Sequence, residues 1–224
     1  MLTLKSDEFF ENIRAGNLEK VKKLVDSDPS LVNAKYKTGA TGILFALYTG
    51  HRELAEFLAH RKLDLDFFEA SALGRLEQLK AMLKRDPGLA KSYSSEGFTA
   101  LGLGAYLGQE EIVQSLIDNG GDVNATAKNQ SGFTALTGAV TNGHTEVAKI
   151  LVSRGANVNH RYEGGFSPLM IAAHNGNLEL TRLLLENEAD VQAQTSDGRI
   201  ALNFAQENGH ADVAALLRER GAKQ

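Results

Sequence analysis

The 224-residue chain contains no cysteine and no tryptophan, and it has only three prolines. Without cysteine it can form no disulfide bond, carry no thiol nucleophile and hold no cysteine-bound metal. Lysine and arginine (24) are fewer than aspartate and glutamate (28), so the basic excess that favours nucleic-acid backbones is missing. The first residues show no long apolar run after a basic head, so neither a secretory signal nor a membrane span is expected. We therefore expect a cytoplasmic protein that binds neither nucleic acid nor membrane.

The sequence also lacks the residue patterns of common catalytic and metal sites. Its six histidines include no His-Glu-x-x-His segment and no two histidines four residues apart. Neither a Gly-x-x-x-x-Gly-Lys-Ser/Thr phosphate loop nor a Gly-x-Ser-x-Gly nucleophile turn occurs. We expect no catalytic residues, no cofactor and no metal ion, and therefore a protein that is not an enzyme.

Glycine, in contrast, recurs at nearly regular intervals. The positions are Gly16, Gly50, Gly74, Gly108, Gly143, Gly176 and Gly209, and the steps between them are 34, 24, 34, 35, 33 and 33 residues. Each of these glycines stands between two short segments with apolar residues at helical spacing, where a left-handed residue can end one helix before the next. The chain is therefore expected to consist of repeated pairs of helices.

The stretch from Gly165 to Ala193 shows this unit most completely. Ser167 can cap a helix, and Pro168 suits the first helical position, where no backbone donor is needed. Gly176 can end that helix, and a second helix with regularly spaced leucines follows. One such unit cannot bury its own apolar face, so several copies must stack into a solenoid.

A period near 33 with a Thr-Pro-Leu-His-like segment resembles the ankyrin repeat family, and the resemblance covers essentially the whole chain. It implies a mostly α-helical ankyrin-repeat solenoid of about seven helix-turn-helix repeats with short β-hairpin fingers. A single domain, 1–224, would hold repeats at approximately 5–36, 37–66, 67–94, 95–125, 126–160, 161–193 and 194–224. The resemblance also implies a monomer that binds an unidentified protein partner.

The third repeat is irregular, because the step from Gly50 to Gly74 is nine residues shorter than the family period. Aligning the repeats removes these residues between Asp66 and Phe67, where the finger would be. We predict that this repeat has no finger and that a notch separates the fingers on either side of it. Asp66 is then expected to cap the helix that begins at Phe67.

Other departures from the family pattern concern the first helix of each repeat. The histidine of the family segment is replaced throughout, by Leu44, Gly102, Thr137, Met170 and Asn203. The hydrogen bond that this histidine makes between repeats is therefore not expected. Ile200 replaces a capping threonine. Gly102, Gly104 and Gly138 indicate either close helix packing or a softened middle of the solenoid.

Glu188 stands where other repeats have a glycine after their second helix, namely Gly120, Gly155 and Gly221. That glycine is expected to have a positive φ, which costs a residue with a side chain roughly 1 kcal/mol. We therefore expect backbone strain at Glu188.

Candidate partner-binding residues occupy equivalent positions in successive repeats. The position after the finger glycine holds Phe98, Phe133, Phe166 and Arg199, and the ends of the first helices hold Tyr48, Tyr106, Leu107 and His174. Aromatic residues and arginine dominate binding hot spots. The phenylalanines either contact a partner or pack between neighbouring fingers, and both alternatives remain open. This column predicts a groove that is apolar and aromatic in its N-terminal half and polar in its C-terminal half.

The resemblance implies a module that binds a protein through its concave face, and two alternatives differ from it in kind. One is a specific inhibitor or immunity-type protein that blocks a partner enzyme, which predicts very tight binding to a single partner. The other is a metabolite-binding protein or an enzyme, which predicts a deep pocket with converging polar groups. The sequence shows no sign of such a pocket.

Overall fold

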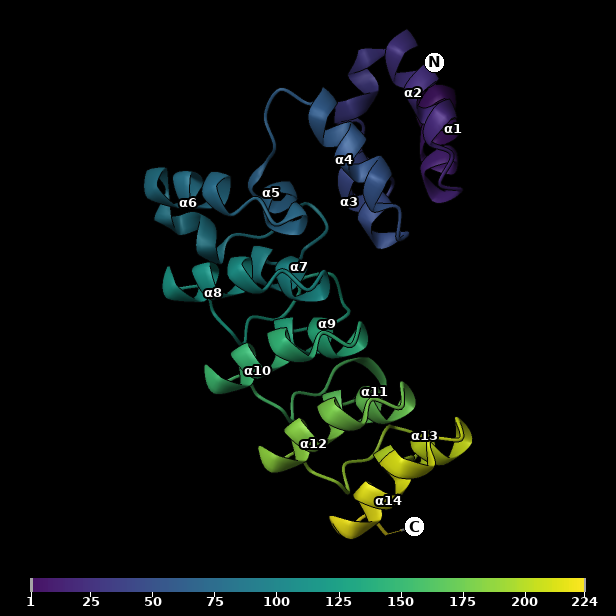
Figure 1. The fold of residues 1–224 in the computed structure, drawn as a ribbon, viewed down its shortest axis with the longest axis vertical. Helices are drawn as coiled ribbons and strands as arrows, with labels where there is room; N and C mark the ends of the chain where they lie inside the picture. Colours follow the sequence, from purple (N-terminus) through teal and green to yellow (C-terminus); the bar gives the residue numbers. More distant parts are fainter. Residues whose placement is uncertain (1, 224) are drawn as a thin grey trace.

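The computed structural model describes residues 2–223, which form an elongated stack of helices (Figure 1). The α-helices of this part of the chain are α1 (Leu2–Arg14), α2 (Leu18–Ser27), α3 (Gly42–Tyr48), α4 (Arg52–Arg61), α5 (Phe67–Leu73), α6 (Leu76–Arg85), α7 (Ala100–Tyr106), α8 (Glu110–Asp118), α9 (Ala135–Thr141), α10 (Thr145–Ser153), α11 (Pro168–His174), α12 (Leu178–Glu186), α13 (Ala201–Glu207) and α14 (Ala211–Glu219). Short 3-10 segments lie in the loops, η1 (Pro29–Asn33), η2 (Pro87–Lys91) and η3 (Glu163–Gly165). None of the helices in residues 2–223 combines the length and apolar character that crossing a bilayer demands.

The helices follow one another as antiparallel pairs. From α5 onward, the odd-numbered helices lie along one side of the stack and the even-numbered helices along the other, and the two chain ends lie at opposite ends (Figure 1). Local chemistry explains most pairs, because a hydroxyl caps the first helix of four of them (α3, α7, α9 and α11) and a left-handed glycine follows that helix. Thr99 accepts the Gly102 N–H at 2.9 Å, and Gly108 has a φ of 72°.

Five loops precede the odd-numbered helices from α3 onward, apart from α5, and we call them finger loops. They comprise residues 36–40, 94–98, 127–133, 162–166 and 195–199, and each is closed by a hydrogen bond from the N–H of its first residue to the carbonyl of its last. β structure in residues 2–223 is limited to the isolated bridges Lys35–Thr41, Tyr93–Thr99 and Tyr162–Phe166. The structure is thus mostly α-helical, as expected, with almost no strand.

Hydrogen bonds join each helix pair to the next without the histidine that the family pattern places in the first helix. Three histidines that follow turn glycines donate through Nε2 to the carbonyl oxygen near the end of the preceding pair's first helix. These are His51 to Arg14 (3.1 Å), His144 to Tyr106 (3.1 Å) and His210 to His174 (3.0 Å). Their role is therefore structural, as their position in the repeat indicates.

The prediction of a repeat without a finger is confirmed. α4 ends at Arg61 and α5 begins at Phe67, and residues 62–66 lack the backbone hydrogen bond that closes each of the five finger loops. Asp66 caps α5 as expected, because its Oδ1 accepts the Glu69 N–H at 2.8 Å while Glu69 Oε2 accepts the Asp66 N–H at 2.9 Å. The Glu69 carboxylate is fully buried and is paired with Lys62 Nζ at 2.6 Å.

The predicted notch is wrong, because the finger loops on either side of the missing finger meet directly. Ser95 Oγ donates to the Gly39 carbonyl at 2.9 Å and accepts from Lys35 Nζ at 3.3 Å. Without an intervening finger, loop 94–98 occupies the place beside loop 36–40. The deletion therefore lets the finger loops form a continuous row.

The helix glycines favour close packing over flexibility at two of three positions. A Cβ on Gly104 would lie 3.1 Å from Ile112 Cγ2, and a Cβ on Gly138 would lie 3.3 Å from the Cβ of Tyr106. A Cβ on Gly102 would approach only Thr99 Oγ1, at 3.1 Å. Gly104 and Gly138 thus let neighbouring helices approach closely, whereas Gly102 leaves a space unfilled.

The C-terminal pair shows how a lost cap is partly replaced. Ile200 offers no side-chain acceptor at the start of α13, as predicted. Asn203 instead accepts the Ile200 N–H through Oδ1 at 2.8 Å. One free donor of the helix start is therefore satisfied by a residue from within the first turn.

Glu188 has a φ of 65°, which confirms its expected left-handed conformation, while Gly120, Gly155 and Gly221 have φ values of 85°, 84° and 95°. Replacing Glu188 by glycine should remove strain worth roughly 1 kcal/mol and raise the melting temperature by a few degrees. Glu186→Gly, in the exposed last turn of α12, is the control and should lower it. A lower melting temperature for Glu188→Gly in a thermal scan would contradict the prediction.

Candidate functional site

The candidate site is the surface made by the finger loops and the last turns of the odd-numbered helices, which we call the inner face. Most aromatic side chains of the predicted column are half-buried there, so each ring is both packed and accessible. Phe98, Phe133, Phe166, Tyr48 and Tyr106 all fall in this class. The two alternatives for the phenylalanine column are therefore not exclusive in this structure.

The N-terminal part of the inner face is organised by Tyr48 and Tyr106. These side chains come from the ends of α3 and α7, and their ring centroids lie 6.1 Å apart in an edge-to-face arrangement. The equivalent residue of the intervening helix α5 is Ala72, which is fully buried. Because alanine is small and its repeat has no finger, tyrosines from non-adjacent helix pairs can reach each other.

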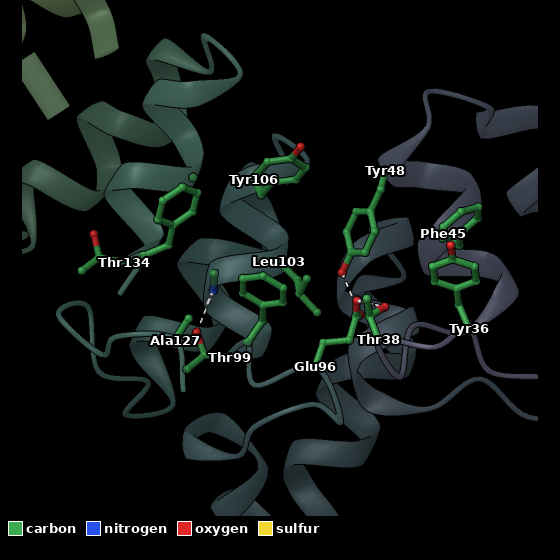
Figure 2. Close-up of a pocket in the computed structure, with 14 residues that line it drawn as sticks. Tyr36, Thr38, Phe45, Tyr48, Glu96, Thr99, Leu103, Tyr106, Ala127 and Thr134 are labelled. Carbon is green, nitrogen blue, oxygen red and sulfur yellow. Dashed lines mark hydrogen bonds between the residues drawn. The ribbon is translucent and has the colours of Figure 1, made fainter. Parts of the chain in front are cut away.

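Glu96 joins this pair from the finger loop before α7. The Tyr48 hydroxyl donates to Glu96 Oε2 at 3.1 Å, and the Thr38 hydroxyl donates to Oε1 at 3.4 Å (Figure 2). Burial raises the pKa of the Tyr48 phenol, and the nearby Glu96 raises it further. Burial also raises the pKa of Glu96, against the opposing effects of the two hydroxyl donors and of Lys35.

The raised pKa of Glu96 predicts a pH-dependent effect on stability. A carboxyl whose pKa is higher in the folded state contributes stability at pH values below its unfolded pKa, and this contribution is lost as the pH rises through the folded value. Glu96→Gln should therefore be more stable than the wild type at pH 7 and no more stable near pH 4. Chemical unfolding at both pH values checks this, with the exposed Glu77→Gln as control. A Glu96→Gln variant less stable than the wild type at pH 7 would contradict it.

The C-terminal part of the inner face holds a continuous row of aromatic rings. Phe133 contacts Tyr162 (centroids 4.9 Å apart), Tyr162 stacks on Phe166 (5.7 Å), and Phe166 contacts Phe204 (5.5 Å). The Arg199 guanidinium lies 4.5 Å from the centroid of the Phe204 ring. Burial raises the pKa of the Tyr162 phenol to about 12.

The remaining predicted residues lie at the margins of these groups. His174 is exposed and lies 6.3 Å from the Phe204 ring, measured between centroids. Arg199 also pairs with Asp197 and Glu207, at 2.8 and 3.4 Å. Leu107 is half-buried against the N-terminal apolar cluster, so it belongs more to the core than to the face.

The C-terminal half of the face is polar, as expected, but it is aromatic as well. A hollow of about 560 Å³ in the C-terminal part has Phe133, Tyr162, Phe166 and Phe204 in its wall together with polar residues such as Asn175. Asparagines at the ends of α9 and α11 are engaged between helix pairs, because Asn142 donates to the Tyr106 carbonyl at 2.7 Å and Asn175 to the Thr141 carbonyl at 3.1 Å. Both halves are therefore aromatic.

Sequence reasoning missed Glu96, Tyr162 and Phe204. A glutamate beside a turn glycine is ordinarily read as solvated, and nothing local to Glu96 distinguishes it. Tyr162 did carry a signal, because Tyr36 holds the equivalent first position of another finger loop. Phe204 lies in the apolar register of α13, where a core role and a surface role look alike.

Comparisons with known proteins place this arrangement in a family. A sequence model described as Ankyrin repeats (3 copies) matches residues 67–162 and 160–224. The ankyrin repeat and SAM domain-containing protein 6 of Mus musculus is 40% identical over 122 residues, and its counterpart in Rattus norvegicus is 39% identical over 122 residues. The segment shared with these two relatives covers 54% of the present chain and only 11% of each relative.

Proposed function

The chain belongs to the ankyrin repeat family, and on this premise we propose that it is a binding module whose partner protein contacts the inner face. Ankyrin repeats are generally protein–protein interaction modules and are not catalytic.

The observation that carries the proposal is the uninterrupted row of half-exposed aromatic rings from Phe133 through Tyr162 to Phe166. Aromatic side chains that offer large rigid surfaces are the commonest anchors of protein interfaces. Arg199 and the exposed His174 lie at the margin of the row and supply a polar rim. A surface of this composition suits a partner that presents apolar side chains to its centre and hydrogen-bonding groups to its edge.

The proposal is tested by affinity capture from a lysate of the source organism, followed by mass spectrometry. A protein recovered with the wild type and with Glu111→Ala, on the outer helix α8, but lost with Phe133→Ala would support the inner face as the binding surface. A partner lost with Glu111→Ala and kept with Phe133→Ala would move the interface to the outer helices.

A further inference from the structure

A pocket of about 370 Å³ lies behind the joined finger loops 36–40 and 94–98. Its lining residues fall within 36–48, 96–106 and 127–138, so they come from the second, fourth and fifth helix pairs. Among the described residues, the third helix pair (α5 and α6) contributes none. The pocket is thus the space left by the missing finger, beside the point where the Ser95–Gly39 hydrogen bond of 2.9 Å joins the two finger loops.

Of the two glycines that line this space, Gly102 is the one that keeps it open. Gly102 and Gly138 both line the pocket, and the added Cβ of a larger residue at 102 would approach only Thr99 Oγ1. The position of Gly102 is that of the family histidine, so a side chain is ordinarily present there. Because Gly102 has no side chain, it leaves room in the pocket that no other described side chain fills.

The lining has an unusual combination of chemistry. Six aromatic residues surround the space, namely Tyr36, Phe45, Tyr48, Phe98, Tyr106 and Phe133. One acidic residue, Glu96, is present, and no lysine, arginine or histidine lines the pocket in the described part of the chain. The Arg14 guanidinium, which is not a lining residue, lies 5.8 and 5.5 Å from the ring centroids of Tyr36 and Phe45, so the other four rings are the ones offered to a ligand. Figure 2 shows the hydrogen-bonded Tyr48–Glu96 pair between Tyr36 and Phe45 on one side and Leu103 and Tyr106 on the other.

Each part of this lining favours the same kind of ligand. The faces of aromatic rings attract cations, most strongly where water is excluded. The half-buried Glu96 carboxylate accepts two hydroxyl donors, and its basic neighbour Lys35 is not among the residues that line the pocket. A positive charge brought close to this carboxylate inside the pocket would therefore stabilise its ionised form. The apolar walls meanwhile require hydrocarbon around that charge. Such a lining disfavours anions, which would face Glu96, and strongly hydrated inorganic cations, which would face the rings.

We propose that this pocket binds an organic ammonium group, with the nitrogen close to Glu96 and the hydrocarbon part enclosed by the aromatic rings. The group can belong to a free amine or to an alkylated lysine side chain. The inference goes beyond the proposed protein-binding function, because it assigns a ligand chemistry to one pocket. It can be tested with defined probes and needs no partner protein.

Isothermal titration at pH 7 with 2-phenylethylamine and 2-phenylethanol tests the proposal. The two probes are similar in shape, and only the amine is charged. We expect the wild type to bind the amine at least tenfold more tightly than the alcohol, and the ratio to fall to near one in Glu96→Gln. Gly102→Leu, whose side chain should fill the pocket, is expected to weaken the binding of both probes at least tenfold. Gly102→Ala is the control for folding, and melting temperatures are measured for each variant.

The outcomes separate clearly. Equal binding of amine and alcohol by the wild type, or no binding of either, would overturn the proposal, and so would amine binding that survives in both Glu96→Gln and Gly102→Leu. A short peptide with a central dimethyllysine, compared with the same peptide carrying norleucine, distinguishes the sources. Tighter binding of the dimethyllysine peptide than of the free amine supports a protein side chain, and the reverse order supports a small molecule.

Discussion

Replacing Lys62 by methionine is expected to lower the free energy of unfolding by about 3–5 kcal/mol, the usual cost of leaving one member of a buried ion pair alone. Lys62 follows α4 directly, and its ammonium lies 2.6 Å from the carboxylate of Glu69, which is fully buried in α5. The pair therefore bridges the short connection where a finger is missing. Methionine keeps most of the apolar stem of Lys62 but removes its ammonium group. Of the two hydrogen-bond donors to the Glu69 carboxylate, Lys62 Nζ and the Asp66 N–H, only the Asp66 N–H then remains.

Urea unfolding of three variants checks this expectation. Lys80→Met removes the partner of Glu77 in an exposed pair and should cost no more than about 0.5 kcal/mol. Lys62→Met combined with Glu69→Leu removes both buried charges and should recover most of the loss. If Lys62→Met were no more harmful than Lys80→Met, the pair would not be important for joining α4 to α5.

Replacing Phe133 by alanine is expected to weaken binding of the captured partner by about 2 kcal/mol or more, which is roughly thirtyfold. Phe133 is half-buried, contacts Tyr162 and contributes to the walls of both the 370 Å³ pocket and the C-terminal hollow. It therefore occupies the centre of the inner face, where hot-spot residues concentrate. Tyr106→Ala, which removes the ring beside Tyr48, should weaken binding in the same direction.

The matched control is Phe204→Ala. This ring contacts Phe166 but is buried, at 4% exposure, so its loss should cost the 3–5 kcal/mol of stability typical of a core phenylalanine. Phe133→Ala should cost clearly less stability, about 1–2 kcal/mol, because its ring is only half-buried. Thermal unfolding and partner affinity are measured on both variants at a temperature where both are folded. If Phe133→Ala lost as much stability as Phe204→Ala and kept full affinity, Phe133 would belong to the core.

Sequence reasoning was most successful where a local rule acts. Helix starts at Ser167 and Asp66 and helix ends at left-handed glycines depend on one or two turns of chain, so their residue types are informative. The positive φ of Glu188 could be predicted for the same reason, because aligned repeats show what that position requires. The missing finger followed from counting residues alone.

The consequences of that missing finger could not be predicted locally. Whether the neighbouring fingers would stand apart or meet depends on the stacking of non-adjacent helix pairs, and contacts such as that between Ser95 and Gly39 span more than fifty residues of sequence. Glu96 illustrates the same limit, because its burial arises from Thr38 and Tyr48 in another repeat. A glutamate in a turn has no local property that reveals such partners.

The sequence by itself determined that this protein is a stack of helix pairs, because no single pair can bury its own apolar face, and it determined where one finger is absent. Tertiary structure alone decided that the absence produces a pocket and not an open notch. The physical reason is that packing brings loop 94–98 against loop 36–40, while Gly102, which has no side chain, leaves the space beside them unfilled. The aromatic rings and Glu96 converge there only because three helix pairs meet around the vacated space.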